Sequence, residues 1–79
     1  MNKFEILISS PPERERLVAE IWYDNMFWAE IFQEQEEGPL GIQFYPHPKK
    51  KCWEFPLDQA MDNLEEAKQR LLGMGGNRE

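Results

Sequence analysis

The segment from Leu17 to Gln33 restricts the possible fold most, because it holds two alternating runs around Asp24-Asn25. The first run is LVAEIWY and the second is FWAEIFQ. Alternation of apolar and polar residues with a period of two is typical of a strand with one buried face. Asp and Asn tolerate the backbone conformations of tight turns. The segment therefore predicts an antiparallel hairpin.

Hydrophobicity predicts the register of this hairpin. Pairing Ile21 with Ala29 and Ala19 with Ile31 gathers the apolar residues of both strands on one face. This register leaves a three-residue loop, Asp24-Asn25-Met26, which suits Asn25 at a left-handed position. We expect that face to be buried.

A two-residue turn would instead place Glu30 opposite Ala19 on the buried face, so the three-residue loop is the preferred interpretation. The other face then carries Trp22 opposite Trp28 and Glu20 opposite Glu30. One helix can cover only one face of a sheet, so we expect this second face to meet solvent.

Three further strands are expected, at 3–9, at 40–46 and, as a short last strand, at 52–55. The charged, proline-containing connector 9–16 separates the first strand from the hairpin. After Pro56, apolar residues recur at helical spacing and predict an amphipathic helix that ends at Gly73. Its expected buried face consists of Leu57, Ala60, Met61, Leu64, Ala67 and Leu71.

These elements predict an α+β fold, an antiparallel β-meander of four to five strands with a C-terminal helix packed on one face. A chain of 79 residues is long enough for one small core. We expect a single domain over 1–73 and a flexible tail over 74–79.

The net charge of −6 is concentrated in one segment. Between Leu17 and Pro48 there are six acidic residues and no Lys or Arg, whereas the rest of the chain is neutral. This distribution argues against a nucleic-acid partner and favours a basic protein partner. A solvated acidic surface that keeps the protein soluble is the alternative.

Few residues suit catalysis or metal binding. His47 and Cys52 are the chain's only histidine and cysteine, and a structural zinc site needs four ligands. Glu20 and Glu30 resemble an acid–base pair, but an open sheet has no pocket to exclude water. We therefore expect no enzyme activity, no cofactor and no metal. The lone cysteine and the lack of a signal peptide or a membrane-length apolar run lead us to expect a cytoplasmic protein.

The second face of the hairpin resembles half of a protein interface. Opposed carboxylates repel each other, and exposed indoles form an apolar patch that a basic partner would cover. Tryptophan is also frequent among interface hot spots. The candidate partner-binding residues are Glu20, Trp22, Asp24, Trp28, Glu30, Phe32, Glu34 and Tyr45. Alternatively, the tryptophans are cross-strand stabilisers and the connector 9–16 folds back over them.

The phrases EILISSPP, LVAEIWY, WAEIFQE, GIQFYP and WEFPLDQAMDNLEEAKQRLL occur in this order between Phe4 and Leu72. This layout resembles the small immunity proteins of bacterial contact-dependent growth inhibition and related polymorphic toxin systems. The resemblance implies a non-enzymatic protein that binds and blocks the C-terminal domain of a toxin, often a basic nuclease. It identifies no functional residue. The alternative is an interaction module that pairs with a second copy or acts as an adaptor without a toxin, so the free protein is expected to be a monomer or a weak homodimer.

Overall fold

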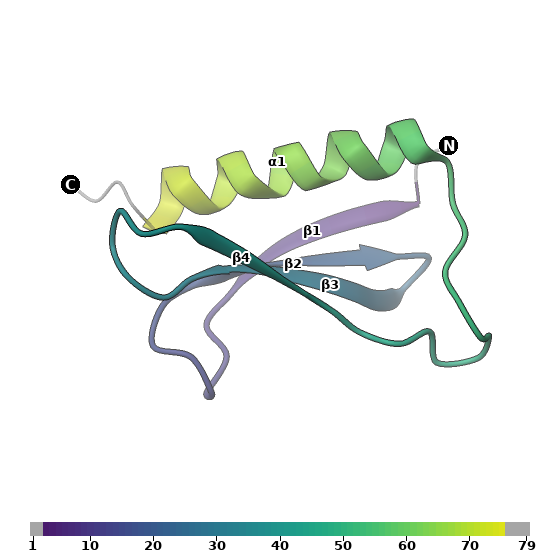
Figure 1. The fold of residues 1–79 in the computed structure, drawn as a ribbon, viewed down its shortest axis with the longest axis horizontal. Helices are drawn as coiled ribbons and strands as arrows, with labels where there is room; N and C mark the ends of the chain where they lie inside the picture. Colours follow the sequence, from purple (N-terminus) through teal and green to yellow (C-terminus); the bar gives the residue numbers. More distant parts are fainter. Residues whose placement is uncertain (1–2, 76–79) are drawn as a thin grey trace.

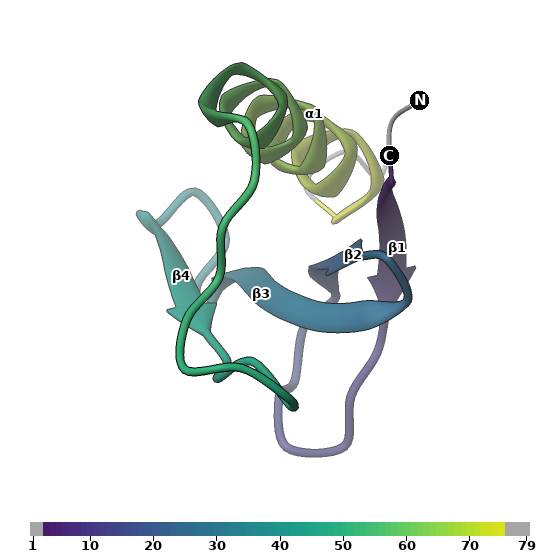
Figure 2. The ribbon, with the colours of Figure 1, turned by 90° about the vertical axis from the view of Figure 1, so that its right-hand side faces the viewer.

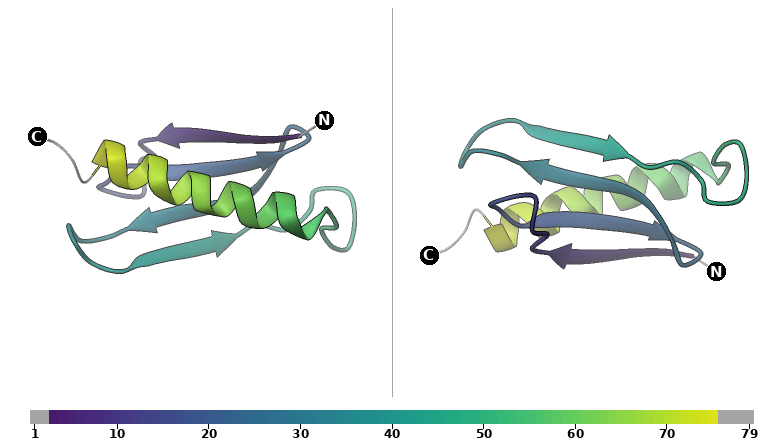
Figure 3. Two further views of the ribbon diagram at one scale, coloured as in Figure 1. Left: turned by 90° about the horizontal axis from the view of Figure 1, so that it is seen from above. Right: turned by 90° about the horizontal axis from the view of Figure 1, so that it is seen from below.

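The computed structural model describes residues 3–75 and contains one antiparallel sheet with strands in chain order. The strands are β1 (Phe4–Ser9), β2 (Val18–Tyr23), β3 (Met26–Gln33) and β4 (Leu40–Phe44). The helix α1 (Leu57–Gly75) crosses one face of this sheet diagonally (Figures 1 and 3). The predicted α+β meander with a C-terminal helix on one face is confirmed.

The hairpin has the predicted pairs, but its turn is shorter than expected. Ala19 lies opposite Ile31, Glu20 opposite Glu30 and Ile21 opposite Ala29. The turn nevertheless has only two residues, Asp24 and Asn25, with φ angles of 52° and 66°. A β-bulge reconciles the two observations, since β3 has one more residue than β2 between the turn and the Ile21–Ala29 pair.

The bulge changes the face on which Trp28 lies. Trp22 pairs with Phe27, and Trp28 is the additional residue of β3. Trp28 joins the core on the helix side, where it contacts Phe4, Phe44 and Phe55. The prediction of Trp28 opposite Trp22 on the solvent face is therefore wrong.

The core lies between α1 and the face of the sheet that carries Ile6, Ala19, Ile21, Ala29 and Ile31. The helix contacts β1, β2 and β3 but has no comparable contact with β4. Its buried positions are Ala60, Asn63, Ala67 and Leu71, with Leu64 partly buried.

Two residues expected on the buried helix face are exposed. Leu57 is 71% exposed and Met61 is 58% exposed. The helix turns its small residues toward the sheet, because alanine at Ala60 and Ala67 allows close approach. The two larger side chains consequently remain outside the core.

The segment between β4 and α1 does not form the predicted fifth strand. It crosses from the sheet to the helix layer, and Phe55 packs against Phe4, Tyr23 and Trp28. The indole N–H of Trp53 donates to the carbonyl of Tyr45 at 2.9 Å. The segment thus runs from the end of β4 to the start of α1 and does not follow β4 (Figure 3).

The helix begins at Leu57 as predicted, and the N–H of Ala60 donates to the carbonyl of Pro56. It continues through Gly73 to Gly75, so the expected stop at Gly73 is wrong. Gly73 has no positive φ, the conformation that usually ends a helix at glycine. Residues 76–79 of the predicted tail lie outside the described part of the chain. Within the described residues, α1 is not apolar enough to cross a membrane.

Candidate interaction surface

The sheet face opposite α1 carries the residues expected to bind a partner, and we call it the outer face. Figure 2 shows the helix on one side of the sheet and the connector between β1 and β2 on the other. Strand pairing arranges the outer face in three rows. From β1 towards β4 they are Glu5, Trp22 and Phe27, continued by Tyr45 just after β4; Leu7, Glu20, Glu30 and Gln43; and Ser9 with Val18, followed by Phe32 with Gly41.

The first row is an aromatic ladder formed by one residue of β2, one of β3 and the residue that follows β4. Trp22 stacks on Phe27 with ring centroids 5.0 Å apart and an interplanar angle of 14°. Phe27 stacks on Tyr45 at 4.4 Å and 24°. All three side chains are half-buried. Phe27 therefore occupies the place that was predicted for Trp28.

Glu30, in the middle row, is only 6% exposed, yet both of its carboxylate oxygens have partners. The guanidinium Nε of Arg14 donates to Oε2 of Glu30. The hydroxyl of Tyr45 donates to Oε1 at 3.1 Å. A buried carboxylate is costly unless it is paired and hydrogen-bonded, and this one is both.

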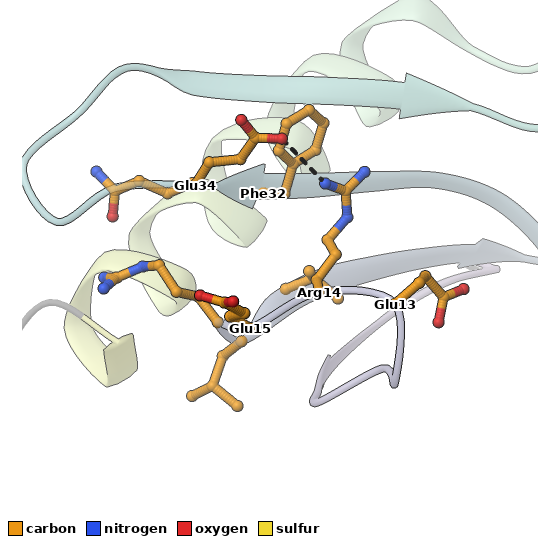
Figure 4. A pocket seen from close by; sticks show the side chains of 9 residues that line it. Glu13, Arg14, Glu15, Phe32 and Glu34 are labelled. Carbon is orange, nitrogen blue, oxygen red and sulfur yellow. Dashed lines mark ion pairs between the residues drawn. The ribbon is translucent and has the colours of Figure 1, made fainter.

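Arg14 comes from the connector and covers the outer face. Its Nη2 donates to Oε1 of Gln43 at 2.9 Å, and its Nη1 lies 3.7 Å from Oε2 of Glu34. The guanidinium carbon lies 3.8 Å from the ring centroid of Phe32 (Figure 4). The connector thus folds back over part of the outer face, as the alternative interpretation expected, but over Phe32 rather than over the tryptophans.

Gly41 makes room for the Phe32 ring. A Cβ atom at Gly41 would lie 2.4 Å from Cζ of Phe32. The ring therefore lies over the bare backbone of β4, with Arg14 near its other side. Glycine, an aromatic ring and a guanidinium form three successive layers here.

Glu20 is the carboxylate of the middle row that remains accessible. It is half-buried and lies directly opposite Glu30. Its Oε1 accepts the indole N–H of Trp22 at 3.1 Å. Among residues 3–75 no Lys, Arg or His forms an ion pair with Glu20.

The remaining candidates are more dispersed. Asp24 is exposed in the hairpin turn, where its N–H donates to the carbonyl of Lys3. Glu34 is exposed just beyond β3, at the opposite end of the hairpin. The structure brings Glu20, Trp22, Glu30, Phe32 and Tyr45 together, places Asp24 and Glu34 at opposite margins, and removes Trp28.

Sequence reasoning missed Arg14 and Phe27 as members of this surface. A signal for Phe27 was present, because Asp and Asn both accept positive φ and so favour a two-residue turn, which requires a bulge to preserve the core pairs. The signal for Arg14 was weaker. Arg14 is a basic residue that lies a few positions before the hairpin. The hairpin itself has opposed acids but no Lys or Arg.

Partial burial and the hydrogen bond to Glu30 raise the pKa of Tyr45 above its usual value of 10.0. The negative charge of Glu30 acts in the same direction, while the positive charge of Arg14 partly opposes it. The phenol is therefore held in its neutral, hydrogen-bond-donating form.

His47 and Cys52 have structural or surface positions. Nδ1 of His47 accepts the backbone N–H groups of Lys49 and Lys50, and its ring lies 4.5 Å from that of Trp53. Cys52 is exposed in the same loop rather than placed in a strand. Within the described residues, no three His, Cys, Asp or Glu side chains gather as a metal site requires.

A small cavity lies beside Arg14, between the connector and the end of β3 (Figure 4). Its volume is about 240 Å³. Phe32 and Val18 of the outer face line it, so it lies at the margin of that face. A larger hollow of about 630 Å³ lies between the hairpin turn and the loop 47–54, and no residue of the three rows lines it.

No protein-family model, no curated protein and no solved structure matches this chain. The geometry of the outer face is therefore the basis for assigning a function.

Proposed function

We propose that this chain is a non-catalytic inhibitor of the immunity type, which binds a basic toxin domain, such as a nuclease, on its outer face. The observation that carries the proposal is the accessible carboxylate of Glu20 beside the half-buried indole of Trp22. A lysine or arginine of a partner would neutralise Glu20 and lie over the aromatic ladder. The fixed Arg14–Glu30 pair beside it would keep the surface preorganised.

The distribution of charge supports the same partner. A nuclease binds a polyanion and therefore has a basic substrate surface. An acidic, aromatic sheet face could occupy that surface and block it. Electrostatic attraction would also speed association, which matters for a protein that must reach a toxin before the toxin acts.

The test screens the reading frames that adjoin the gene of this chain for a product that is toxic to cells, and then measures binding to that toxin domain and protection of cells. Replacing Glu20 with Lys and Trp22 with Ala should weaken binding by about 100-fold, as expected for a charge reversal and an aromatic anchor at an interface. Association should also slow as the ionic strength rises.

Asp62→Lys is the matched control, because Asp62 is an exposed helix residue with no ion pair among the described residues. This variant should bind and protect like the original protein. If the variant at Glu20 and Trp22 protects equally well, the proposed surface is wrong. If the unmodified chain neither binds the toxin domain nor protects, the proposed function is wrong.

A further inference from the structure

The free side of β4 combines unpaired backbone groups with exposed apolar side chains. The N–H of Tyr45 donates to the carbonyl of Trp28 at 2.8 Å, so the groups of Tyr45 face β3. Because these groups alternate along a strand, those of Leu40, Ile42 and Phe44 face away from the sheet. The strand order leaves β4 without a second neighbour among the described strands.

The same three residues lie on the helix side of the sheet, where Leu40 is partly buried against the core and Ile42 and Phe44 extend beyond the cover of α1. Ile42 is 41% exposed and Phe44 is 58% exposed. Leu40 and Ile42 border a groove of about 340 Å³, whose opposite wall includes Met61 and Leu64 of α1. Met61 is exposed at this groove rather than buried in the core. It therefore faces the side of β4 that has no neighbouring strand.

The other edge of the sheet is protected. Arg70 of α1 donates from Nη1 to the carbonyl of Ile6 in β1, at 3.4 Å. Edge strands usually carry charges or a cover that prevents pairing with other chains. The β4 sequence LGIQF has no charged residue, and among residues 3–75 no side chain hydrogen-bonds to its backbone.

Opposite charges flank β4 along the chain. The turn before it carries Glu34, Glu36 and Glu37, and the loop after it carries Lys49, Lys50 and Lys51. Figure 3 shows this turn and this loop at opposite ends of β4. An antiparallel copy of β4 would therefore bring the acidic turn of each chain beside the basic loop of the other.

We infer that β4 pairs antiparallel with β4 of a second copy of this chain, forming a twofold-symmetric dimer with a continuous eight-stranded sheet. Centred on Ile42, this arrangement pairs Leu40 of one copy with Phe44 of the other. Pro46, the next outward-facing position, has no N–H and ends the pairing. Both helices lie on the same side, so the exposed Met61 side chains approach each other. The outer faces remain open, which makes this surface distinct from the one proposed for a toxin.

The first test is the mass of the protein in solution, measured by sedimentation equilibrium. The unmodified chain should sediment with twice the mass of one chain. Ile42→Lys should weaken dimerisation by about 100-fold or more, because two like charges would meet at the symmetry axis. Leu7→Lys is the control, since Leu7 is 44% exposed on β1 of the outer face. It should remain dimeric.

The second test is a charge exchange. One variant carries Glu36→Lys with Glu37→Lys, and the other carries Lys49→Glu with Lys50→Glu. Each alone should be monomeric, because its turn and loop would repel those of its copy. Mixed together they should form a heterodimer, since both contacts become attractive again. Each variant stays net negative, because the chain starts at −6 and two reversals change its charge by four.

Because both variants are net negative, their overall charges repel each other. A heterodimer would therefore have to form through the local contacts between turn and loop. A protein that is monomeric up to about 1 mM would overturn the inference, since specific interfaces are stronger than this. Dimerisation that Ile42→Lys leaves intact, or that Leu7→Lys abolishes, would also overturn it. Failure of the charge-exchanged pair to associate would contradict the antiparallel arrangement.

Discussion

Glu30 illustrates how single residues determine the character of the outer face. A carboxylate in the middle of a sheet, directly opposite Glu20, would be unfavourable without compensation. Arg14 and Tyr45 supply that compensation from two different loops flanking the strands. A cation that was expected from a partner is thus provided, at this position, by the chain itself. The accessible acid of the middle row is consequently Glu20.

Removing Arg14 should be costly, because it leaves a buried carboxylate with only the Tyr45 hydroxyl. We expect Arg14→Met to lower the free energy of unfolding by about 3 kcal/mol. Arg14→Met combined with Glu30→Met should cost less than the sum of the single changes, since two apolar side chains need no partner. Denaturant unfolding of the original protein, the two single variants and the double variant measures this coupling.

Arg16→Met serves as the control, because Arg16 has no ion pair among the described residues. Its effect should stay within about 0.5 kcal/mol. Equal effects of the changes at Arg14 and Arg16 would show that the Arg14–Glu30 pair does not contribute as argued.

The raised pKa of Tyr45 predicts a dependence on pH. Because the folded-state pKa lies above 10.0, the stabilisation by the neutral hydroxyl is fully present below pH 10.0 and is lost as the pH rises through the folded pKa. The original protein should have a larger free energy of unfolding than Tyr45→Phe at neutral pH, and this difference should shrink in alkaline solution.

Absorbance of the tyrosinate ion follows the same group directly. Glu30→Gln should lower the pKa of Tyr45, because the phenolate would no longer face a carboxylate. An unchanged titration curve in Glu30→Gln would contradict the role assigned to this hydrogen bond.

At the level of elements, the hairpin shows what alternation can and cannot predict. The pairs Ala19–Ile31 and Ile21–Ala29 follow from the need to bury apolar residues, and they were predicted correctly. A three-residue loop and a two-residue turn with a bulge both preserve these pairs. The choice between them depends on local turn energetics, and it decides whether Trp28 faces the core. For this reason the fold was more predictable than the outer face.

Gly41 supplies a second prediction for an element, the β3–β4 pair. Gly41→Ala should lower the free energy of unfolding by about 1–3 kcal/mol, because the new methyl group would displace the Phe32 ring. Gly73→Ala is the contrasting variant, since nothing lies within 4 Å of its new Cβ and the residue is helical. It should be neutral or stabilise by up to about 1 kcal/mol. Equal effects in thermal unfolding would contradict the close packing of Phe32 on Gly41.

At the scale of the whole molecule, the sheet offers two surfaces of different character. The outer face is acidic and aromatic, and we assign it to a basic partner. The free side of β4 is apolar and flanked by opposite charges, and we assign it to a second copy. Neither assignment excludes the other, because the two surfaces lie on a face and an edge of the same sheet.

The position of the helix explains why the second surface could not be predicted. The spacing of apolar residues predicts that α1 is amphipathic. It does not determine which of these residues point most directly at the sheet. Ala60 and Ala67 face the sheet, while Leu57 and Met61 are left exposed. A small rotation of α1 about its own axis would turn Met61 towards the core. In the observed orientation Met61 stays outside, and the β4 side of the core is left uncovered.

The most direct measurement is quenching of Trp22 fluorescence by a soluble quencher, in a variant with Trp28→Phe and Trp53→Phe. The emission of Trp22 should be quenched in the free protein and become protected when the toxin domain binds. A Trp22 that is already protected in the free protein, or equally quenched in the complex, would contradict binding on the outer face.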